Sequence, residues 1–179
     1  MFGEWRSYQK SLVLFLLVVA GVTLALAFAP RLLADQPSEA AILARGAGTT
    51  IVQGGTGPSG GFVPVLTKIA FFAEQKGAGV TGGLDCLALA PEAAMGSTSA
   101  QFTVNVMYVT GRVTGAAVQG GTATLTGTAD VTGLGAGSHV PFTFVVHRGG
   151  PGATSVLTVS GLTFPEMLLE GAFQVGGSR

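Results

Sequence analysis

The sequence predicts an all-β domain, an antiparallel sandwich or small barrel of about eight strands, preceded by one N-terminal transmembrane helix. Three observations lead to this fold class. Residues 12–29 form an uncharged apolar run, residues 62–179 alternate apolar and polar side chains, and glycine-rich turns separate the alternating segments. Only 10% of the 179 residues are charged, while 47% are hydrophobic and 29 are glycine, so the chain has ample apolar content for a core.

The N-terminal residues have the features of a membrane anchor. The run 12–29, LVLFLLVVAGVTLALAFA, would span about 27 Å as a helix, close to the hydrocarbon thickness of a bilayer. We therefore expect a short cytoplasmic or interfacial segment at 1–11 and a transmembrane helix at 12–30. Aromatic and basic residues flank the run, as is typical of the headgroup region. The expected membrane-interface anchors are Trp5, Arg6, Tyr8, Lys10 and Arg31.

One face of this helix carries small residues at a spacing that lets transmembrane helices pack closely. These residues are Gly21, Ala25 and Ala29, and a plain lipid-facing anchor is the alternative. The run contains no histidine and no ionisable residue, so we expect neither a pigment ligand nor a proton or ion path in it. The expected neighbours of the helix are integral membrane protein subunits and the lipid bilayer.

The same segment also fits a cleaved secretory signal, with a cut after Ala27, although a retained anchor is the preferred interpretation. The basic residues on its two sides balance, so the positive-inside rule gives no orientation. A long, charge-poor, turn-rich region after an N-terminal anchor is usually exported. We therefore expect a single-pass protein of the cell inner membrane, with residues 31–179 in the periplasm.

Residues 31–61 are expected to be a Gly/Ser/Pro-rich linker between the anchor and the domain. Ser38 fits a helix N-cap, and 40–45 fits a short helical turn. The next segment, 46–61, reads GAGTTIVQGGTGPSGG and has no helical period. Such a composition is typical of a flexible linker or of an extended arm that lies along a partner. The all-β domain would then occupy 62–179.

An alternation with a period of two identifies the strands. In 101–109, Phe102, Val104, Val106 and Tyr108 fall on one face, and Met107 falls on the other. The predicted inward residues of 122–131 and 139–147 are Ala123, Leu125, Ala129, Val131, Val140, Phe142, Phe144 and Val146. Further strands are expected at 65–73, 84–89, 112–118, 155–160 and 171–175, with a short helix allowed at 91–96 or 165–170.

The stretch 109–152, VTGRVTGAAVQGGTATLTGTADVTGLGAGSHVPFTFVVHRGGPG, resembles the bacterial exported β-domains named post-COAP-1. The shared features are a strand that ends in glycine, a short Gly-Thr-rich hairpin, an aromatic-alternating strand and a turn of the type D-x-G-x-P-G. Here the turn reads HRGGPG, with His147 at the acidic position. The resemblance, extended over 62–175, implies an exported all-β module without an established catalytic role, and it supplies no site residues.

Residues that could carry chemistry are few. Nine basic and nine acidic residues give no net charge, which argues against a nucleic-acid binder, since such a protein needs a basic stripe. His139 and His147 would stand roughly 26 Å apart on one strand, too far to share a metal ion. The lone Cys86 cannot form an internal disulfide, and we expect it to be buried and structural.

The acidic residues are scattered along the domain. Glu166 and Glu170 would be i, i+4 neighbours one turn apart only if their segment is helical, and a solvated helical end is preferred to a catalytic dyad. Gly96-Ser97 and Ser160-Gly161 do not form a nucleophile elbow, and the glycine runs match neither a Walker A loop nor a G-x-G-x-x-G placed between a strand and a helix. We therefore expect no enzymatic activity, no cofactor and no metal site.

The preferred hypothesis is a non-catalytic, single-pass accessory or structural subunit of a larger bacterial membrane complex, photosynthetic or respiratory by analogy. Its β-domain would brace the periplasmic face, because a charge-poor domain would leave apolar surface exposed if it stood alone. The alternative is an independent membrane-anchored binding module for a glycan, peptide or surface protein, in which Tyr108 is the only tyrosine of the domain. An enzyme whose site is assembled from distant residues is the third hypothesis.

Overall fold

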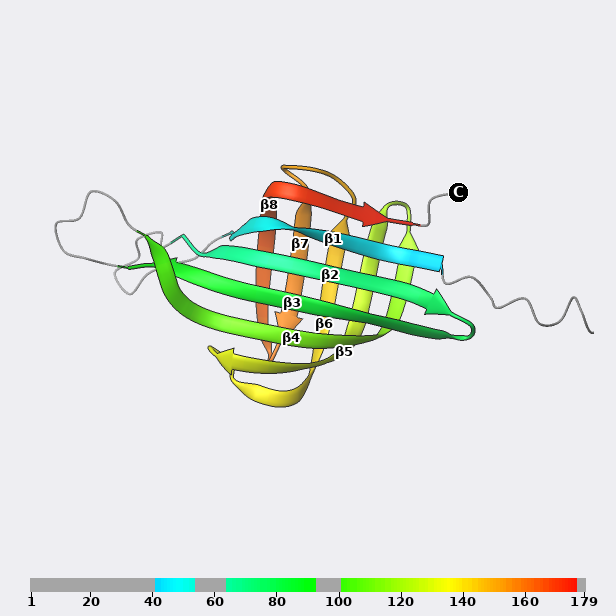
Figure 1. The fold of residues 1–179 in the computed structure, drawn as a ribbon, viewed down its shortest axis with the longest axis horizontal. Helices are drawn as coiled ribbons and strands as arrows, with labels where there is room; N and C mark the ends of the chain where they lie inside the picture. Colours follow the sequence, from blue (N-terminus) through cyan, green and yellow to red (C-terminus); the bar gives the residue numbers. More distant parts are fainter. Residues whose placement is uncertain (1–40, 54–63, 93–100, 177–179) are drawn as a thin grey trace, which may run out of the picture. The chain divides into compact units, whose positions relative to one another are not determined.

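The computed structural model describes residues 41–53, 64–92 and 101–176. These residues form eight antiparallel strands, each paired with the next, and the last strand pairs with the first to close a barrel (Figure 1). β1 to β4 lie side by side across the front of Figure 1, and β6 and β7 cross behind them. The strands are β1 (Ala41–Val52), β2 (Leu66–Lys76), β3 (Gly79–Pro91), β4 (Phe102–Gln119), β5 (Thr122–Gly133), β6 (Gly137–His147), β7 (Thr154–Val159) and β8 (Leu162–Val175).

The all-β expectation is confirmed, and the architecture is a barrel rather than a sandwich. In the part of the chain that the structure describes, no helix has the length and apolar character needed to cross a membrane. The expected helix at 12–30, its interface anchors and its packing face lie outside the described residues; they are Trp5, Arg6, Tyr8, Lys10, Arg31, Gly21, Ala25 and Ala29.

The first strand corrects the predicted linker. Residues 41–52 form neither a helical turn nor a linker, because they pair with β2 on one side and with β8 on the other. The glycine content of this strand has a packing role, as Gly46 shows. A Cβ atom at Gly46 would lie 2.7 Å from the Phe173 ring and 2.8 Å from the Phe71 ring. The glycine therefore leaves the room that the two rings fill, and the barrel begins at residue 41 rather than 62.

The predicted inward face of the fourth strand is wrong at Val104 and Tyr108, whereas Val106 is half-buried and packs against the core. The segments 101–109 and 112–118 form one strand, β4, in which Met107 and Val109 are buried while Val104 and Tyr108 are 46% and 39% exposed. The pairing of β3 with β4 shifts register between Ala88 and Leu89, and such a bulge reverses which residues face inward. The inward phase of β4 is the one that continues from Met107 to Val113.

The eighth strand replaces the allowed helix at 165–170. Glu166 and Leu168 face inward, whereas Glu170 is exposed, because the pairing of β1 with β8 shifts register between Thr49 and Thr50. For the other allowed helix, at 91–96, Pro91 is the last residue of β3, and 93–96 lie outside the described residues.

The core fills the barrel interior. Phe71 packs edge-to-face against Phe144 and Phe173, with ring centroids 5.1 Å and 5.4 Å apart. An eight-stranded barrel is just wide enough for its interior to be filled by side chains. The inward faces predicted for β5 and β6 are confirmed, with Val140 half-buried and the others buried; those buried are Ala123, Leu125, Ala129, Val131, Phe142, Phe144 and Val146.

Candidate functional site

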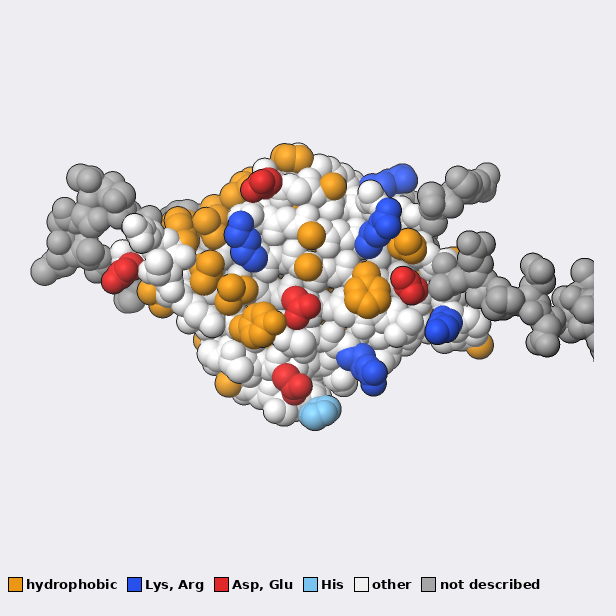
Figure 2. Space-filling model, viewed as in Figure 1, with side chains coloured by type: hydrophobic (Ala, Val, Ile, Leu, Met, Phe, Trp, Pro, Cys, Tyr) orange, Lys and Arg blue, Asp and Glu red, His pale blue; other side chains and the backbone are white. Residues whose placement is uncertain are grey.

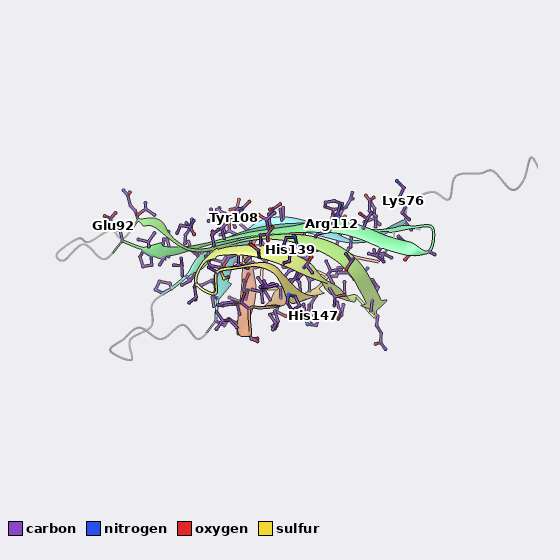
Figure 3. The ribbon with its side chains drawn as sticks, turned by 90° about the horizontal axis from the view of Figure 1, so that it is seen from below. Lys76, Glu92, Tyr108, Arg112, His139 and His147 are labelled. Carbon is purple, nitrogen blue, oxygen red and sulfur yellow. The ribbon has the colours of Figure 1, made fainter. Side chains whose placement is uncertain are left out.

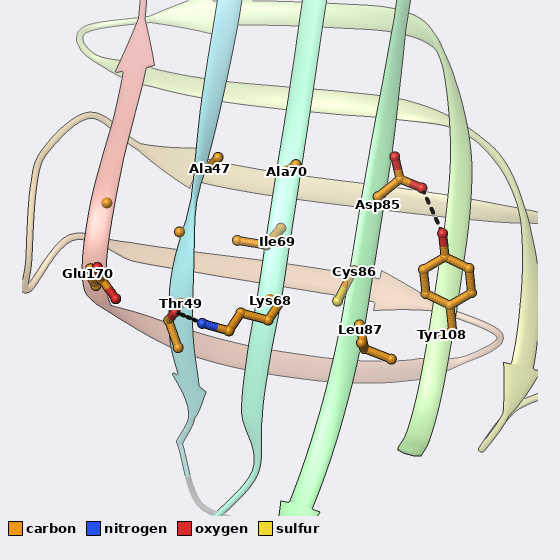
Figure 4. Close-up of a pocket in the computed structure, with 12 residues that line it drawn as sticks. Ala47, Thr49, Lys68, Ile69, Ala70, Asp85, Cys86, Leu87, Tyr108 and Glu170 are labelled. Carbon is orange, nitrogen blue, oxygen red and sulfur yellow. Dashed lines mark hydrogen bonds between the residues drawn. The ribbon is translucent and has the colours of Figure 1, made fainter. Parts of the chain in front are cut away.

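A shallow hollow lies on the outer surface of β8, β1, β2, β3 and β4 (Figure 4). We call it the outer hollow; its volume is about 560 Å³, and apolar atoms make up most of its lining. The cross-strand register places five outward side chains in one row across the strands. In order around the barrel these are Glu170, Thr49, Lys68, Leu87 and Tyr108.

Short side chains beside this row produce the hollow. The neighbouring row contains Ala172, Ala47 and Ala70 on β8, β1 and β2, and then Asp85 on β3. Three methyl groups in succession leave a depression between longer side chains, with Phe72, 48% exposed, in the row beyond them. Figure 2 shows this face, where hydrophobic side chains are interspersed with acidic and basic ones.

Polar groups of the outer hollow make few contacts with one another. The Tyr108 hydroxyl donates a hydrogen bond to Asp85 Oδ1 over 3.3 Å, and Lys68 Nζ donates one to Thr49 Oγ1 over 2.6 Å. Within the described ranges, the one approach of a basic to an acidic side chain within 4.0 Å is that of His139 Nδ1 to Asp130 Oδ1, 3.8 Å apart and elsewhere on the barrel. Asp85 and Glu170 are therefore exposed carboxylates without a cationic partner among these residues.

A second arrangement lies inside the barrel. We call it the interior cluster: Thr50, Thr67, Ser155 and Glu166, each no more than 2% exposed. They come from β7, β8, β1 and β2, which follow one another around the closed barrel. Thr50 on β1 is paired with Thr67 on β2, and Ser155 on β7 is paired with Glu166 on β8. Thr50 Oγ1 donates a hydrogen bond to Glu166 Oε2 over 2.5 Å. The hydroxyls of Thr67 and Ser155 have no hydrogen-bond partner among the described residues.

Burial controls the charge of this cluster. Removal from water raises the pKa of Glu166 from an ordinary value of 4.5 to about 7, although the hydrogen bond from Thr50 acts in the opposite direction. Burial also raises the pKa of the Cys86 thiol, and the nearby Glu166 carboxylate adds to that rise. Cys86 is buried, as predicted, and its thiol stays protonated and therefore a weak nucleophile.

The other residues that the sequence analysis considered as metal ligands or catalytic acids lie apart from one another in the structure. His139 and His147 lie at opposite ends of β6, both exposed (Figure 3); His147 contacts the Thr122 hydroxyl and His139 lies beside Asp130. Over residues 41–53, 64–92 and 101–176, no group of three or more His, Cys, Asp or Glu side chains converges to hold a metal ion. Glu166 and Glu170 do not form a pair, because one lies inside the barrel and the other outside.

The interior cluster and the outer hollow were both missed from the sequence. Each depends on the register between strands that are distant in the chain, such as β1 with β8. The available signal was a polar residue at an inward position of an alternating strand, as at Ser155 between buried neighbours of β7. A polar residue can be assigned to the barrel interior only when it is known which alternate residues of its strand face inward.

Comparison of the chain with protein-family models, with curated protein sequences and with solved structures gives no match. A functional conclusion for this barrel therefore depends on its surfaces and on its buried groups.

The buried carboxyl predicts an unusual pH dependence of stability. The pKa of Glu166 is about 7 in the folded chain and near 4.5 when unfolded, so between these values the folded state holds a proton that the unfolded state has lost. The contribution of Glu166 to the free energy of unfolding should be highest below pH 4.5 and fall by about 3 kcal/mol as the pH rises to 7. Urea denaturation of wild type and Glu166→Gln between pH 4.5 and 7.5 measures this difference. Equal pH slopes in the two proteins would contradict the prediction.

The two interior threonines should respond in opposite ways to removal of the hydroxyl. Thr50→Val deletes a hydrogen bond to Glu166 and should lower the free energy of unfolding by about 1–2 kcal/mol. Thr67→Val has nearly the same shape but removes a hydroxyl without a partner, so it should leave stability unchanged or raise it by up to about 1 kcal/mol. Urea denaturation at pH 6 compares them, and a larger loss for Thr67→Val would refute this description of the cluster.

Proposed function

We propose that this chain is a non-catalytic accessory subunit of a larger bacterial membrane complex, held in the inner membrane by a single helix at 12–30. In this proposal the barrel lies in the periplasm, braces the exported face of the complex and docks there on a partner protein. The resemblance of 109–152 to exported β-domains supports the placement outside the cytoplasm. A photosynthetic reaction-centre or respiratory complex is the proposed host, by analogy with other single-span subunits.

The observation that carries the proposal is the outer hollow and its surroundings. Its lining is mainly apolar, and two exposed aromatic residues, Phe72 and Tyr108, lie on the same face of the barrel. A concave, mainly apolar surface with exposed aromatic side chains is typical of a protein–protein interface. A partner that covers this face would remove the apolar surface from water.

The position of Glu166 supports a non-catalytic role. It is the described acid with a strongly raised pKa, which is a property shared by many catalytic acids. However, its side chain is 2% exposed, faces the barrel interior and is hydrogen-bonded to Thr50. It therefore lies on the opposite side of the barrel wall from the outer hollow, where a ligand would be reached from solvent.

The alternative function is a membrane-anchored binding module for a glycan, a peptide or a surface protein. The size of the outer hollow, about 560 Å³, falls within the range of small-molecule sites. Tyr108, Asp85, Lys68 and Glu170 would supply an aromatic surface and polar groups around an apolar floor. This module would bind its ligand without belonging to a stable complex.

A charge placed in the floor of the hollow distinguishes these functions. The tagged full chain is expressed in its native membrane, extracted in mild detergent and separated by native electrophoresis. Wild type should migrate with a larger assembly, and Ala70→Glu should reduce the assembled fraction about tenfold, since an unpaired buried charge costs an interface several kcal/mol. Ala117→Glu, at an exposed alanine of β4 outside the hollow, is the matched control and should assemble like wild type.

Two results would contradict the proposal. A wild-type chain that migrates alone under these conditions excludes a stable accessory subunit. Equal assembly of Ala70→Glu and Ala117→Glu, with both barrels folded by circular dichroism, excludes the outer hollow as the docking surface.

A further inference from the structure

Tyr108 and Asp85 form the one aromatic–carboxylate pair of the outer hollow. They project from the adjacent strands β4 and β3, and the Tyr108 hydroxyl donates its hydrogen bond to Asp85 Oδ1 over 3.3 Å. Both side chains are exposed, Tyr108 by 39%. The other carboxylate oxygen of Asp85 accepts no hydrogen bond from the described residues, so it remains available to a donor from outside the chain.

The charge of this pair is not compensated by its neighbours. Three cations surround Asp85. Lys68 on β2 donates its hydrogen bond to Thr49, Arg45 on β1 donates to Gln174, and Arg112 lies on β4 opposite Gly83. In the described portion of the chain, none of the three comes within 4.0 Å of a carboxylate oxygen. Asp85 thus presents a negative charge beside an aromatic ring on an otherwise mainly apolar surface.

An arginine side chain has the chemistry that matches these groups. A guanidinium group donates two parallel hydrogen bonds to a carboxylate and also stacks on an aromatic face, whereas an ammonium group acts as a point charge. The aliphatic part of arginine needs apolar contacts, which Ala70 and Leu87 supply beside Asp85. Arginine and tyrosine are also the side chains that most often dominate the binding energy of interfaces.

We propose that the Tyr108–Asp85 pair is the recognition point of the outer hollow for an arginine side chain carried by the docking partner. This inference rests on the proposed docking function and specifies the chemistry of the partner. The arginine stem lies over Ala70 and Leu87, and its guanidinium group bonds Asp85 and stacks against the ring of Tyr108. Glu170, three strands away across the hollow, lies too far from Asp85 to share the same guanidinium group.

The chain offers a direct spectroscopic test, because it contains two tyrosines. Tyrosine-ring carbon labelling of the full chain in detergent micelles gives two signals, and Tyr108→Phe assigns them. The probe is acetyl-Gly-Arg-Gly-amide, and the matched probe replaces arginine by citrulline, which has the same shape without the charge. The arginine peptide should shift the Tyr108 signal with an affinity at least about fivefold higher than the citrulline peptide.

Two variants complete the test. Asp85→Asn should weaken binding of the arginine peptide about five- to tenfold, whereas Asp130→Asn, an exposed carboxylate outside the hollow, should leave it unchanged. Equal binding of the two peptides, or an Asp85→Asn chain that binds like wild type, would overturn the inference. Because this titration uses the chain without its partner, its failure is distinct from failure of co-migration, which would overturn the docking function itself.

Discussion

Closure of the barrel between β1 and β8 is the constraint on which the rest of the structure depends. The ladder runs from Ala44 opposite Val175 to Val52 opposite Glu166, and the hydrogen bond from Thr50 to Glu166 spans the same seam inside the barrel. Without β1, the strands β2 and β8 would each expose an unpaired edge. Closure also brings Glu170 and Ala172 into the rows that form the outer hollow, so the surface and the interior both depend on this one pairing.

The seam is maintained by residues of unusually small size. Gly46 lies where the rings of Phe71 and Phe173 meet, and Gly48 lies against Leu168 and the Glu170 backbone. A side chain at either position would have to displace core residues, which cores of native packing density tolerate poorly. The same glycines give 46–61 the composition of a linker, and for this reason composition alone assigned β1 to the wrong class.

The sequence predicts the inward face of a strand correctly where apolar and polar residues alternate without interruption along that strand. The inward residues of β5 and β6, such as Leu125 and Phe144, were predicted correctly because their alternation is uninterrupted. The phase of β4 was not, because a bulge in its pairing with β3 changes the inward set at Met107. Because register shifts arise from packing between strands, the sequence of a single strand does not predict where they occur.

The candidate site was less predictable than the fold for the same reason. Lys68, Leu87 and Tyr108 are far apart in the chain and become neighbours through pairing of β2, β3 and β4. Glu166 looked like one of two surface acids, yet closure places it inside beside Thr50. The barrel wall thus separates a buried, proton-binding interior from a mainly apolar outer hollow, which is the proposed docking surface.

We propose that a membrane subunit of the host complex covers the face of the barrel formed by β8 and β1 to β4. The most direct measurement is photo-crosslinking in intact native membranes, with benzoylphenylalanine in place of Ala70 in the outer hollow or of Ala117 outside it. We expect one discrete crosslinked membrane subunit from position 70 and none from position 117. Absence of a crosslink at position 70, or the same products from both positions, would contradict the proposal.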